Sequence, residues 1–489
     1  MAIPVETFFL RPGDKGTLQA RIQQMVAEGV LSGRFRRGEK MPSTRRLAAH
    51  LGVSRITVAL AYTELQATDY LTSRDRSGTY ISEGAPEPPD FPETPRAERV
   101  DWQRAMGRRF AAGAVPVRPA DWASYRYPFI YGQADPKLFD HANWRLCAVQ
   151  ALGARDFGAL TQDYYDRDDP QLVEFLARQT LPRRGIQARP EEILITLGAQ
   201  NALWLASQIL LSRGRRAAVE DPCYPALRVL LGQTGCALSP IAVDAQGLPP
   251  EAVPEGTDVI FTTPSHQCPS GATLPLTRRH ALLERARALE AVIVEDDYEF
   301  EMAYLQPPTP ALKSLDGDGR VVYVGSFSKS LFPGLRLGYL VGAEPFIREA
   351  RALRASVLRH PPGHIQRTAA HFLSLGHYDS LVRRIGRALG QRRQVMEEEI
   401  ARNGLDVAGV AAHGGSSFWM RAPEGIDTDR LSAELQRDSV LIEPGGPFFQ
   451  RPDTPRNFYR LGYSSIASER IPEGIARIAQ ALARPRSRG

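Results

Sequence analysis

Residues 321–336 read VVYVGSFSKSLFPGLR, an apolar run of strand length followed by small polar residues around a single lysine, Lys329. The run at residues 321–324 is rich in β-branched and aromatic residues, which is typical of a strand buried on both faces of a sheet. A lysine beside such a strand needs a reason, because an unpaired charge is costly to bury. The stretch therefore indicates a buried parallel sheet with a lysine at its edge.

Runs of the same kind recur beyond residue 125 and alternate with longer helical patterns. One example is EEILIT at residues 191–196, which is followed by LGAQNALWLASQILLS at residues 197–212. Alternating strands and helices predict a mostly parallel sheet with helices on both faces. From about residue 375 one long charged helix and then short strands predict a smaller α+β part. The expected fold class of residues 125–485 is therefore α/β, with a large and a small part.

The residues that follow each apolar run form the candidate site, because ligands of an open parallel sheet collect beyond the carboxyl ends of its strands. Five runs end in a small-residue helix start, an aromatic ring, a His-Gln pair, an acid with a phenol, and the serine-flanked lysine. In chain order these residues are Gly198-Ala199-Gln200, Tyr224, His266-Gln267, Asp296 with Tyr298, and Lys329 with Ser326 and Ser328.

These groups suit the cofactor pyridoxal phosphate. Lys329 can form an imine with its aldehyde, and burial favours the neutral amine that this requires. Asp296 would keep the pyridine nitrogen protonated, since a nearby opposite charge favours the charged form. Tyr224 is suited to stack on the ring. We expect Tyr298 to donate to the ring phenolate oxygen, helped by one of the pair His266 and Gln267.

The phosphate of such a cofactor needs hydrogen-bond donors and positive charge. Backbone amides at a helix start form an anion site, serines add hydroxyls, and an arginine offers a planar bidentate fork. The residues expected to do this are Gly198, Ala199, Gln200, Ser326, Ser328 and Arg336. Any one of these motifs alone is usually an ordinary loop, so the prediction depends on their joint occurrence at strand ends.

The N-terminal segment carries nearly all of the net charge. Residues 1–82 hold 12 Lys and Arg against 7 Asp and Glu, whereas the whole 489-residue chain has a net charge of +6. A basic excess confined to one small segment is typical of a nucleic-acid-binding module joined to another domain. Ordinary variation of surface charge is the alternative explanation.

Two helices and a hairpin are predicted after a first helix at residues 17–32. The stretch MPSTRRLAAHLGVSRITVALAYTELQATDYL at residues 41–71 indicates two helices, with Ser43 or Thr44 as the cap of the first and Ser54 as the cap of the second. Two short β-like runs at residues 70–82 follow. The segment therefore predicts a winged helix-turn-helix, with a small helical bundle that has a solvated basic face as the alternative.

The second of these helices is expected to enter the major groove of DNA. Arg55, Thr57 and Tyr62 lie on or near its exposed side in this prediction. The apolar surface is supplied by Val58, Leu60, Ala61 and Leu65. Four arginines would meet phosphates: Arg45 and Arg46 in the helix capped by Ser43 or Thr44, and Arg74 and Arg76 in the hairpin. The predicted DNA-contact set is Ser43, Thr44, Arg45, Ser54, Arg55, Thr57, Tyr62, Arg74 and Arg76.

A proline-rich segment separates the two expected domains. Residues 83–97, EGAPEPPDFPETPRA, hold five prolines and few apolar residues, which indicates a semi-extended linker. The expected division is a DNA-binding domain at residues 10–82, a linker at 83–124 and the α/β domain at 125–485. Neither a signal peptide nor a membrane span is evident. The four cysteines share no close spacing, so we expect no disulfide framework, no metal site and a cytoplasmic location.

Both halves resemble known families. EKMPSTRRLAAHLGVSRITVALAYTELQATDYL resembles the start of a GntR-type repressor, over residues 15–82. ITLGAQNAL, EDPCYPALR, TTPSHQCPSG, VIVEDDYEFE and VGSFSKSLFPGLRLGYL resemble the fold-type I aminotransferase domain, over residues 125–485. The combination resembles the MocR family of bacterial transcription regulators, whose members include regulators of vitamin B6, GABA, taurine and ectoine genes.

The resemblance implies a role for each matching residue. It makes Lys329 the aldimine lysine, Asp296 the pyridine partner, Tyr298 the phenol contact and Tyr224 the stacking residue. It also implies that Arg336 is a phosphate ligand and that Arg460 binds the acidic group of an effector. Ala226 stands where the GABA-responsive member has an arginine. An amine with one acidic group, such as taurine or an ectoine-derived amino acid, therefore fits better than one that needs two arginines.

The expected function is ligand-controlled transcription regulation rather than catalysis. An amine would exchange with Lys329 on the cofactor, and the protein would bind double-stranded operator DNA as a homodimer. The alternative is an active pyridoxal-phosphate-dependent aminotransferase that carries a DNA-binding head. We favour the regulator, because an enzyme has no need of a winged helix, and likeness of fold is no proof of turnover.

Overall fold

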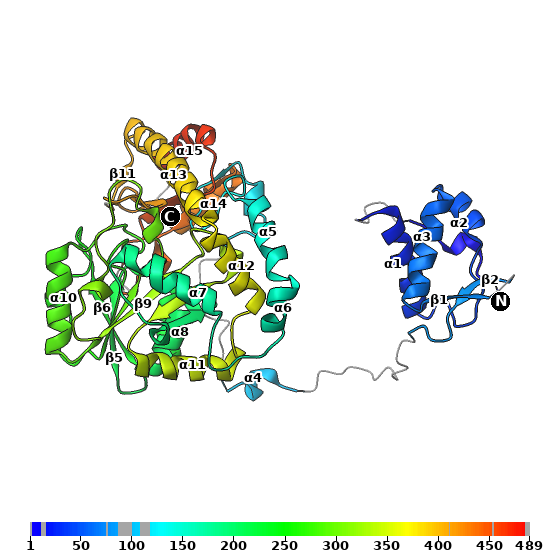
Figure 1. The fold of residues 1–489 in the computed structure, drawn as a ribbon. Helices are drawn as coiled ribbons and strands as arrows, with labels where there is room; N and C mark the ends of the chain where they lie inside the picture. The colour runs from blue at the N-terminus through cyan, green and yellow to red at the C-terminus, as the bar shows by residue number, and fades with distance from the viewer. Residues whose placement is uncertain are drawn as a thin grey trace. The chain divides into compact units, whose positions relative to one another are not determined.

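A computed structural model of the chain forms two compact units, Met1–Arg108 and Arg109–Gly489, which are described separately (Figure 1). The division falls within residues 83–124, the segment expected to be a linker. The structure describes residues 2–10, 16–74, 77–86, 100–107, 118–409, 411–451 and 454–484. In this part of the chain no helix is long and apolar enough to cross a membrane.

The N-terminal unit is a winged helix-turn-helix. Each helix begins where the sequence offers a cap: the side chains of Thr17, Ser43 and Ser54 accept backbone N–H groups of the first turn. Gly52 ends the second helix in the left-handed conformation, with φ of 67°. The elements are η1 (Val5–Thr7), α1 (Leu18–Leu31), α2 (Thr44–Leu51), α3 (Arg55–Ala67), β1 (Leu71–Arg74) and β2 (Gly78–Ile81), with the short helix α4 (Trp102–Ala105) beyond them.

A single apolar core holds the winged helix-turn-helix together. It joins Ile22 and Val26 of α1 to Leu47 of α2 and Val58 of α3, with Ile81 of β2 closing it. The strands β1 and β2 pair antiparallel as the wing. Within the described residues, this core is therefore built from the N-terminal unit alone.

A seven-stranded sheet forms the centre of the C-terminal unit. Its strand order is β4-β10-β9-β8-β7-β5-β6. All neighbouring strands are parallel except β10, which runs antiparallel to both β4 and β9. The strands are β4 (Ile193–Thr196), β5 (Arg216–Asp221), β6 (Ala237–Ala242), β7 (Val259–Thr262), β8 (Val292–Asp296), β9 (Val321–Ser326) and β10 (Gly338–Val341).

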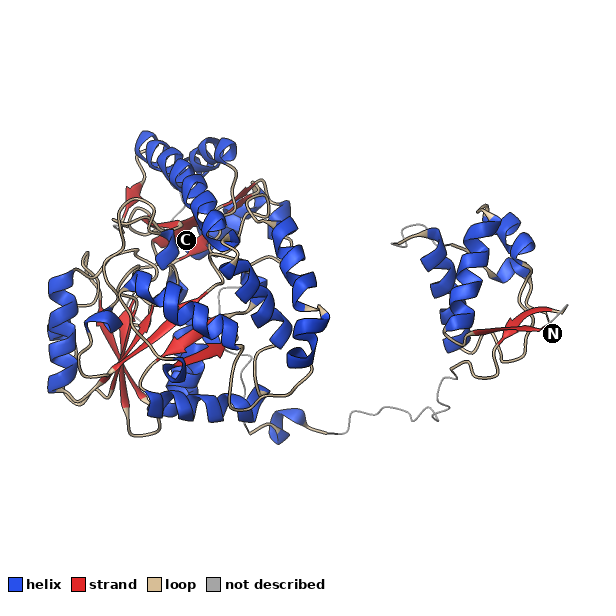
Figure 2. Ribbon diagram, viewed as in Figure 1, coloured by secondary structure: helices blue, strands red, loops and turns tan. Residues whose placement is uncertain are grey.

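Helices cover both faces of this sheet, as Figure 2 shows. One face packs against α8 (Ala199–Leu210), α9 (Pro225–Thr234) and α11 (Glu344–Leu358). The other face packs against α7 (Pro170–Phe175), α10 (Leu276–Ala288) and α12 (Gly363–Ser374). Successive residues of a strand point to opposite faces, so the inner strands β7, β8 and β9 carry apolar residues on both faces over most of their length. The fold class expected for this region is confirmed. Two further helices, α5 (His141–Ala151) and α6 (Ala154–Leu160), precede α7.

A smaller part follows the 26-residue helix α13 (His377–Arg402). It contains an antiparallel sheet of strand order β11-β12-β15-β14, with α14 (Thr428–Arg437) and α15 (Ile471–Ala483). The strands are β11 (Asp406–Val407), β12 (Ser417–Arg421), β14 (Glu443–Pro444) and β15 (Phe458–Gly462). A short parallel pair, β3 (Tyr127–Pro128) with β13 (Val440–Leu441), ties the start of the unit to this part. The segment after β3 is therefore fixed beside the small sheet.

Candidate functional site

A cavity of about 290 Å³ lies at the carboxyl ends of the central strands. The strands β5, β8 and β9 are parallel, so the residues that follow them come to the same edge of the sheet. Ten of the residues selected from the sequence line the cavity: Ala199, Gln200, Tyr224, Asp296, Tyr298, Ser326, Ser328, Lys329, Arg336 and Arg460. The sheet therefore brings together most of the residues that lie far apart in the chain.

Lys329 lies in the wall of this cavity, and its Nζ is 3.9 Å from the centroid of the Tyr131 ring. Burial disfavours the charged ammonium and lowers the pKa of Lys329 to about 8, although the carboxylate of Glu299 opposes this shift. Gly132 makes room for the amine: a Cβ there would lie 2.4 Å from Nζ, and the backbone φ is +77°. An appreciable fraction of the amine is therefore neutral near pH 7.

Asp296 is the last residue of β8, and its carboxylate is buried in the same cavity. Its Oδ1 has no hydrogen-bond partner among the described residues. Burial, followed by the charges of Asp297 and Glu220, raises the pKa of Asp296 to about 7. An unpaired, buried carboxylate fits a ligand that presents a cationic N–H group.

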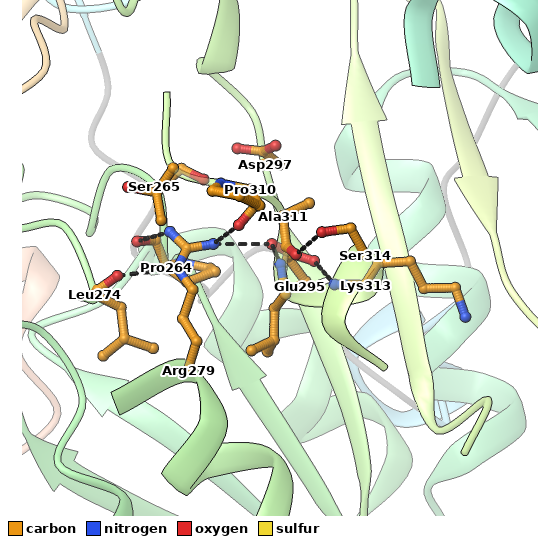
Figure 3. A network of polar contacts seen from close by, with 12 residues as sticks. Pro264, Ser265, Leu274, Arg279, Glu295, Asp297, Pro310, Ala311, Lys313 and Ser314 are labelled. Carbon is orange, nitrogen blue, oxygen red and sulfur yellow. Dashed lines mark hydrogen bonds and ion pairs between the residues drawn. The ribbon is translucent and has the colours of Figure 1, made fainter. Parts of the chain in front are cut away.

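The two acids beside Asp296 each pair with a buried arginine, and Figure 3 shows the contact between Glu295 and Arg279. Asp297 accepts from Arg184 Nε at 2.7 Å, and Glu295 accepts two backbone amides at 2.8 Å and lies 3.9 Å from Arg279 Nη1. Successive side chains along a strand alternate in direction, which separates Asp296 from both neighbours. The end of β8 therefore offers one carboxylate to the cavity and fixes the other two in the protein.

The aromatic and amide residues do not all reach the cavity. Tyr224 and Tyr298 line it, and the Tyr298 hydroxyl donates to the backbone oxygen of His266 at 2.9 Å. The Gln267 amide instead donates to Glu220 Oε2 at 3.1 Å and to two backbone oxygens. The ring nitrogens of His266 are buried without a hydrogen-bond partner in the described part of the chain, and burial lowers its pKa.

The prediction that His266 or Gln267 assists Tyr298 at the ring is therefore corrected. Gln267 donates to the buried Glu220, which also accepts hydrogen bonds from Thr262 and Thr263 and so is compensated for its lost hydration. His266 contributes its backbone oxygen to Tyr298, and its side chain is absent from the cavity lining.

The start of α8 and the loop after β9 form the opposite end of the site. Gly198 precedes α8 with φ of +82°, and a Cβ there would lie 3.3 Å from Arg336 Nη2. Arg336 Nη2 donates to the backbone oxygen of Leu197 at 3.0 Å. The first amides of a helix have no acceptor within the helix, so Ala199 and Gln200 offer donors here. This arrangement suits an anionic group.

Arg460 comes from β15 and is already paired in the structure. Its Nε donates to Glu443 Oε2 at 2.7 Å, and its guanidinium lies over the rings of Tyr131 and Phe448. The Tyr131 ring therefore has Arg460 at 4.0 Å and Lys329 at 3.9 Å from its centroid. Glu443 and Tyr131 both line the cavity.

Sequence reasoning missed Tyr131, Gly132 and Glu443. The available signal was weak: Tyr131-Gly132 stands just beyond the short strand β3, and Glu443 stands in a strand of two residues. Their place at the site follows from the pairings of β13 with β3 and of β14 with β15. Within the described residues, no group of three His, Cys, Asp or Glu side chains could hold a metal ion.

The residues selected for DNA contact divide into caps and exposed cations. The hydroxyls of Ser43 and Ser54 cap α2 and α3, and Thr57 Oγ1 lies 2.8 Å from Ser54 Oγ. Arg45 and Arg55 are exposed, and Thr44 opens α2 half-buried. In the wing, Arg74 lies over the Tyr80 ring and 3.6 Å from Glu83. Arg76 lies outside the described residues.

One residue of this set was placed on the wrong side of its helix. Tyr62 is buried, with an exposed fraction of 3%, and its hydroxyl donates to the backbone oxygen of Pro42 at 2.9 Å. It lies four residues after Val58, which is on the inward face, so both side chains point into the core. Leu60 was predicted to share one apolar surface with Val58, Ala61 and Leu65; the structure buries those three and leaves Leu60 exposed.

Comparisons with known proteins agree with this division into two units. The model of the bacterial regulatory proteins of the gntR family matches residues 18–81, and that of the class I and II aminotransferases matches residues 137–478. Among solved structures, kynurenine aminotransferase of Pyrococcus horikoshii has a TM-score of 0.71 at 26% identity. Alpha-aminoadipate aminotransferase LysN of Thermus thermophilus has a TM-score of 0.69 at 26% identity. Each match covers 78% of this chain and 98% of the other.

Relatives with both units are similar along the chain. HTH-type transcriptional regulator TauR of Rhodobacter capsulatus is 60% identical, over 99% of this chain and 100% of its own. HTH-type pyridoxine biosynthesis transcriptional regulator PdxR of Corynebacterium glutamicum is 31% identical, over 78% of each chain. Probable rhizopine catabolism regulatory protein MocR of Rhizobium meliloti is 29% identical, over 95% of this chain and 94% of its own. The chain therefore belongs to the MocR-type transcription regulators of the GntR family, in which a winged helix-turn-helix is joined to a class I and II aminotransferase domain.

Proposed function

We propose that this regulator holds pyridoxal phosphate in the cavity of its C-terminal unit and uses it to sense a small amine. The observation that carries the proposal is the carboxylate of Asp296, whose Oδ1 is buried at the cavity with no partner among the described residues. Such a group destabilises the protein unless a ligand pairs with it. The protonated nitrogen of a pyridine ring supplies that partner.

The other residues of the cavity fit the remaining parts of the cofactor. When bound, pyridoxal phosphate supplies an aldehyde that condenses reversibly with primary amines. Lys329, with its lowered pKa, provides the neutral amine for that carbon. The first turn of α8 and Arg336 suit the phosphate, and Tyr224 lies in the cavity wall where a ring could stack.

An amine effector would compete with Lys329 for the aldehyde of the bound cofactor, and the amine of Lys329 would then be free in the cavity. Gene control requires that the effector bind two arrangements of the protein with different affinity. We infer that the affinity of the N-terminal unit for operator DNA changes in response, and that the regulated genes serve the metabolism of that amine. A cytoplasmic location follows from action on DNA.

The charges of the cavity favour an effector with a single acidic group. Arg460 Nε is occupied by Glu443 and its Nη1 lies 4.0 Å from Cys268 Sγ, so Nη2 is the nitrogen best placed to bind an anion. A second acidic group on the effector would meet the carboxylate of Glu443 or Asp296, both of which line the cavity. Taurine and an ectoine-derived amino acid each fit this requirement, and taurine is the first amine to test.

The alternative function is an aminotransferase with a DNA-binding head. A released Lys329 amine could also move a proton on the bound substrate, so the site itself does not forbid turnover. The relatives reported above are named as regulators, two of them as transcriptional regulators, and likeness of fold to aminotransferases is weak support for turnover.

One experiment separates the two functions. The full chain loaded with pyridoxal phosphate is mixed with taurine, and the cofactor absorbance, the carbonyl product and operator binding are followed together. A regulator gives a saturable change in absorbance and in DNA affinity without product beyond one equivalent. Accumulation of an aldehyde or keto acid over many turnovers, with DNA binding unchanged, would contradict the proposal.

Two lysine variants control that experiment. Lys329→Ala removes the amine that binds the aldehyde, so the imine absorbance band and the response to taurine should both disappear. Lys137→Ala removes an exposed lysine outside the cavity lining and should preserve both signals. An imine band that persists in Lys329→Ala would show that the cofactor is held elsewhere.

We also infer that the regulator is a homodimer. Helix α5 and the residue after it expose Leu146, Val149 and Leu152, which are spaced three residues apart along one side. Exposed apolar side chains at helical spacing are typical of a surface that another protein covers. A second copy fits, because a two-headed protein matches two operator half-sites. The molecular mass of Val149→Asp and of the unchanged protein, measured by light scattering, tests this. If the variant remains a dimer at low protein concentration, helix α5 is excluded from the interface.

A further inference from the structure

Two large apolar side chains are exposed on the helix that follows the turn of the helix-turn-helix. Ile56 and Leu60 of α3 have exposed fractions of 72% and 51%. They lie four residues apart, so they share one side of the helix on adjacent turns. The opposite side buries Val58, Tyr62 and Leu65 in the core. Ile56 and Leu60 therefore contribute little to the stability of the unit.

Exposed arginines occur on α3 and on the neighbouring helix α2. Arg55 precedes Ile56 directly, and Arg45 and Arg46 are exposed on α2. With respect to the described residues, these three guanidinium groups have no hydrogen-bond or ion-pair partner. No acidic residue occurs in α3 before Glu64. The pair therefore follows an exposed arginine directly, in a unit with further exposed arginines on the neighbouring helix α2, and this suits a polyanion that carries apolar groups between its charges.

The major groove of duplex DNA has this chemistry. Phosphates line both edges of the groove, and thymine is the base that presents an apolar group there, its C5-methyl. In a helix-turn-helix the N-terminal residues of the second helix meet the base edges. Ile56 is the second residue of α3, and Leu60 stands one turn further along.

We propose that Ile56 and Leu60 recognise thymine methyl groups, so that each operator half-site carries T·A base pairs opposite these two side chains. Arg55 then lies beside them, where an arginine suits the N7 and O6 atoms of guanine. The inference rests on the DNA-binding role of the N-terminal unit and is independent of the cofactor and the effector.

The size of the expected effect follows from the area that is buried. Removing one methyl group from an apolar contact weakens binding about fourfold at room temperature. Truncation of Ile56 to alanine removes three carbons and should weaken specific binding by at least about tenfold. The effect of Leu60→Ala should be smaller, because it lies further from the N-terminus of α3.

The test uses the full chain and DNA sites that the protein itself selects from a pool of random duplexes. Each thymine of the selected site is replaced in turn by deoxyuridine, which removes the methyl and keeps the Watson–Crick pairing. Affinity is measured by fluorescence anisotropy at one fixed salt concentration. One or two thymines in each half-site should give the fourfold loss, and the others should give none.

A double-mutant cycle assigns the contact to a side chain. If Ile56 touches a thymine methyl, Ile56→Ala and the deoxyuridine substitution will not be additive: the variant should no longer distinguish thymine from uracil at that position. Leu31→Ala is the matched control, because Leu31 is similarly exposed, at 47%, but ends α1. That variant should keep both the affinity and the thymine preference.

Three results would overturn the inference. The first is a selected site whose affinity is unchanged when all thymines are replaced by deoxyuridine. The second is an Ile56→Ala variant that binds the site as tightly as the unchanged protein. The third is full additivity in the cycle, which places the methyl contact on another residue. If the unchanged protein enriches no sequence at all, the DNA-binding role itself fails, which is a different outcome.

Discussion

The ionised carboxylate of Asp296 is unfavourable in its buried position, and a cationic ligand would stabilise it. Burial and the charge of Asp297 raise its pKa from 3.8 to about 7 in the ligand-free protein. Between about pH 4 and pH 7 the folded state keeps a proton that the unfolded state has lost. The contribution of Asp296 to the free energy of unfolding therefore falls as pH rises through this range, and the loss persists above pH 7.

The variant Asp296→Asn should separate stability from cofactor binding. Without cofactor, at pH 8, we expect it to be more stable than the unchanged protein by roughly 2–4 kcal/mol, because no buried charge remains. At pH 5 the difference should be far smaller. The same variant should bind pyridoxal phosphate more weakly, because an amide does not stabilise a protonated pyridine. Urea unfolding at the two pH values and a cofactor titration measure these effects.

The control for Asp296→Asn is Glu424→Gln, which removes an exposed acid and should change neither measurement. A variant Asp296→Asn that is less stable than the unchanged protein at pH 8 would contradict the burial argument. Undiminished cofactor affinity would contradict the assignment of Asp296 to the pyridine nitrogen.

Glu443 should act as a filter on the charge of the effector. It balances Arg460 across paired positions of β14 and β15 and also lines the cavity. In Glu443→Gln the repulsion of a second acid is removed, while an amide oxygen can still accept from Arg460. We expect the affinity for aspartate relative to taurine to rise by about tenfold, measured by the change in cofactor absorbance. An unchanged ratio would show that Glu443 does not face the effector.

Site residues at the carboxyl end of a buried strand could be predicted from the sequence pattern, because the parallel sheet brings these ends to one edge. Asp296, Tyr298 and Lys329 are of this kind. Glu443 and Tyr131 were not predicted, since their neighbours at the site come from pairings between short strands distant in the chain. Gln267 was misplaced because its strand-end position says nothing about the buried Glu220 that binds its amide.

On the scale of elements, α3 shows how the phase of a helix decides a prediction. Its helical character and its cap at Ser54 could be predicted, but the inward side was assigned incorrectly at Tyr62. Alanine-rich stretches such as VALAYT give few large apolar residues to fix the phase. The core partners of α1 and α2 fix it in the structure.

Because Tyr62 is buried, substituting it should affect the stability of the N-terminal unit rather than its affinity for DNA. Its hydroxyl joins α3 to Pro42, just before α2, at 2.9 Å. Tyr62→Phe should lower the stability of the N-terminal unit by about 1 kcal/mol through loss of a buried hydrogen bond, and specific DNA affinity should stay unchanged. Thermal unfolding and anisotropy measure the two quantities, with Leu31→Ala as the exposed control. If the Tyr62→Phe variant is fully folded and still loses much of its affinity for DNA, Tyr62 lies at the DNA interface after all.

The central sheet was predicted as mostly parallel, and the exception explains how Lys329 is held. The strand β10 has only four residues and returns antiparallel beside β9, with Gly338 opposite Ser326. The loop that carries Lys329, between β9 and β10, is therefore held at both ends, since the N–H of Phe327 also donates to the backbone oxygen of Leu337 at 3.1 Å. A run of four residues carries no sequence signal for its direction, so this return could not be predicted.

On the scale of the whole molecule, each unit has its own apolar core. The core of the N-terminal unit is closed by α1, α2, α3 and the wing. The C-terminal unit has separate cores on the two faces of its main sheet and in the small part. Units with separate cores fold independently as a rule, so we expect that cutting the chain between the two units unfolds neither of them.

Separating the units should uncouple sensing from DNA binding. A fragment of residues 118–489 should bind pyridoxal phosphate and change its absorbance with taurine as the full chain does, because the described lining of the cavity lies in it. A fragment of residues 1–86 should bind one half-site, but about 10²-fold or more weakly than the full chain binds the whole operator, since two linked heads raise the effective concentration. Taurine should not alter the affinity of the isolated head. Titrations of both fragments and of the full chain measure these differences. If the fragment of residues 1–86 binds the operator as tightly as the full chain does, dimerisation through the C-terminal unit contributes nothing to DNA binding.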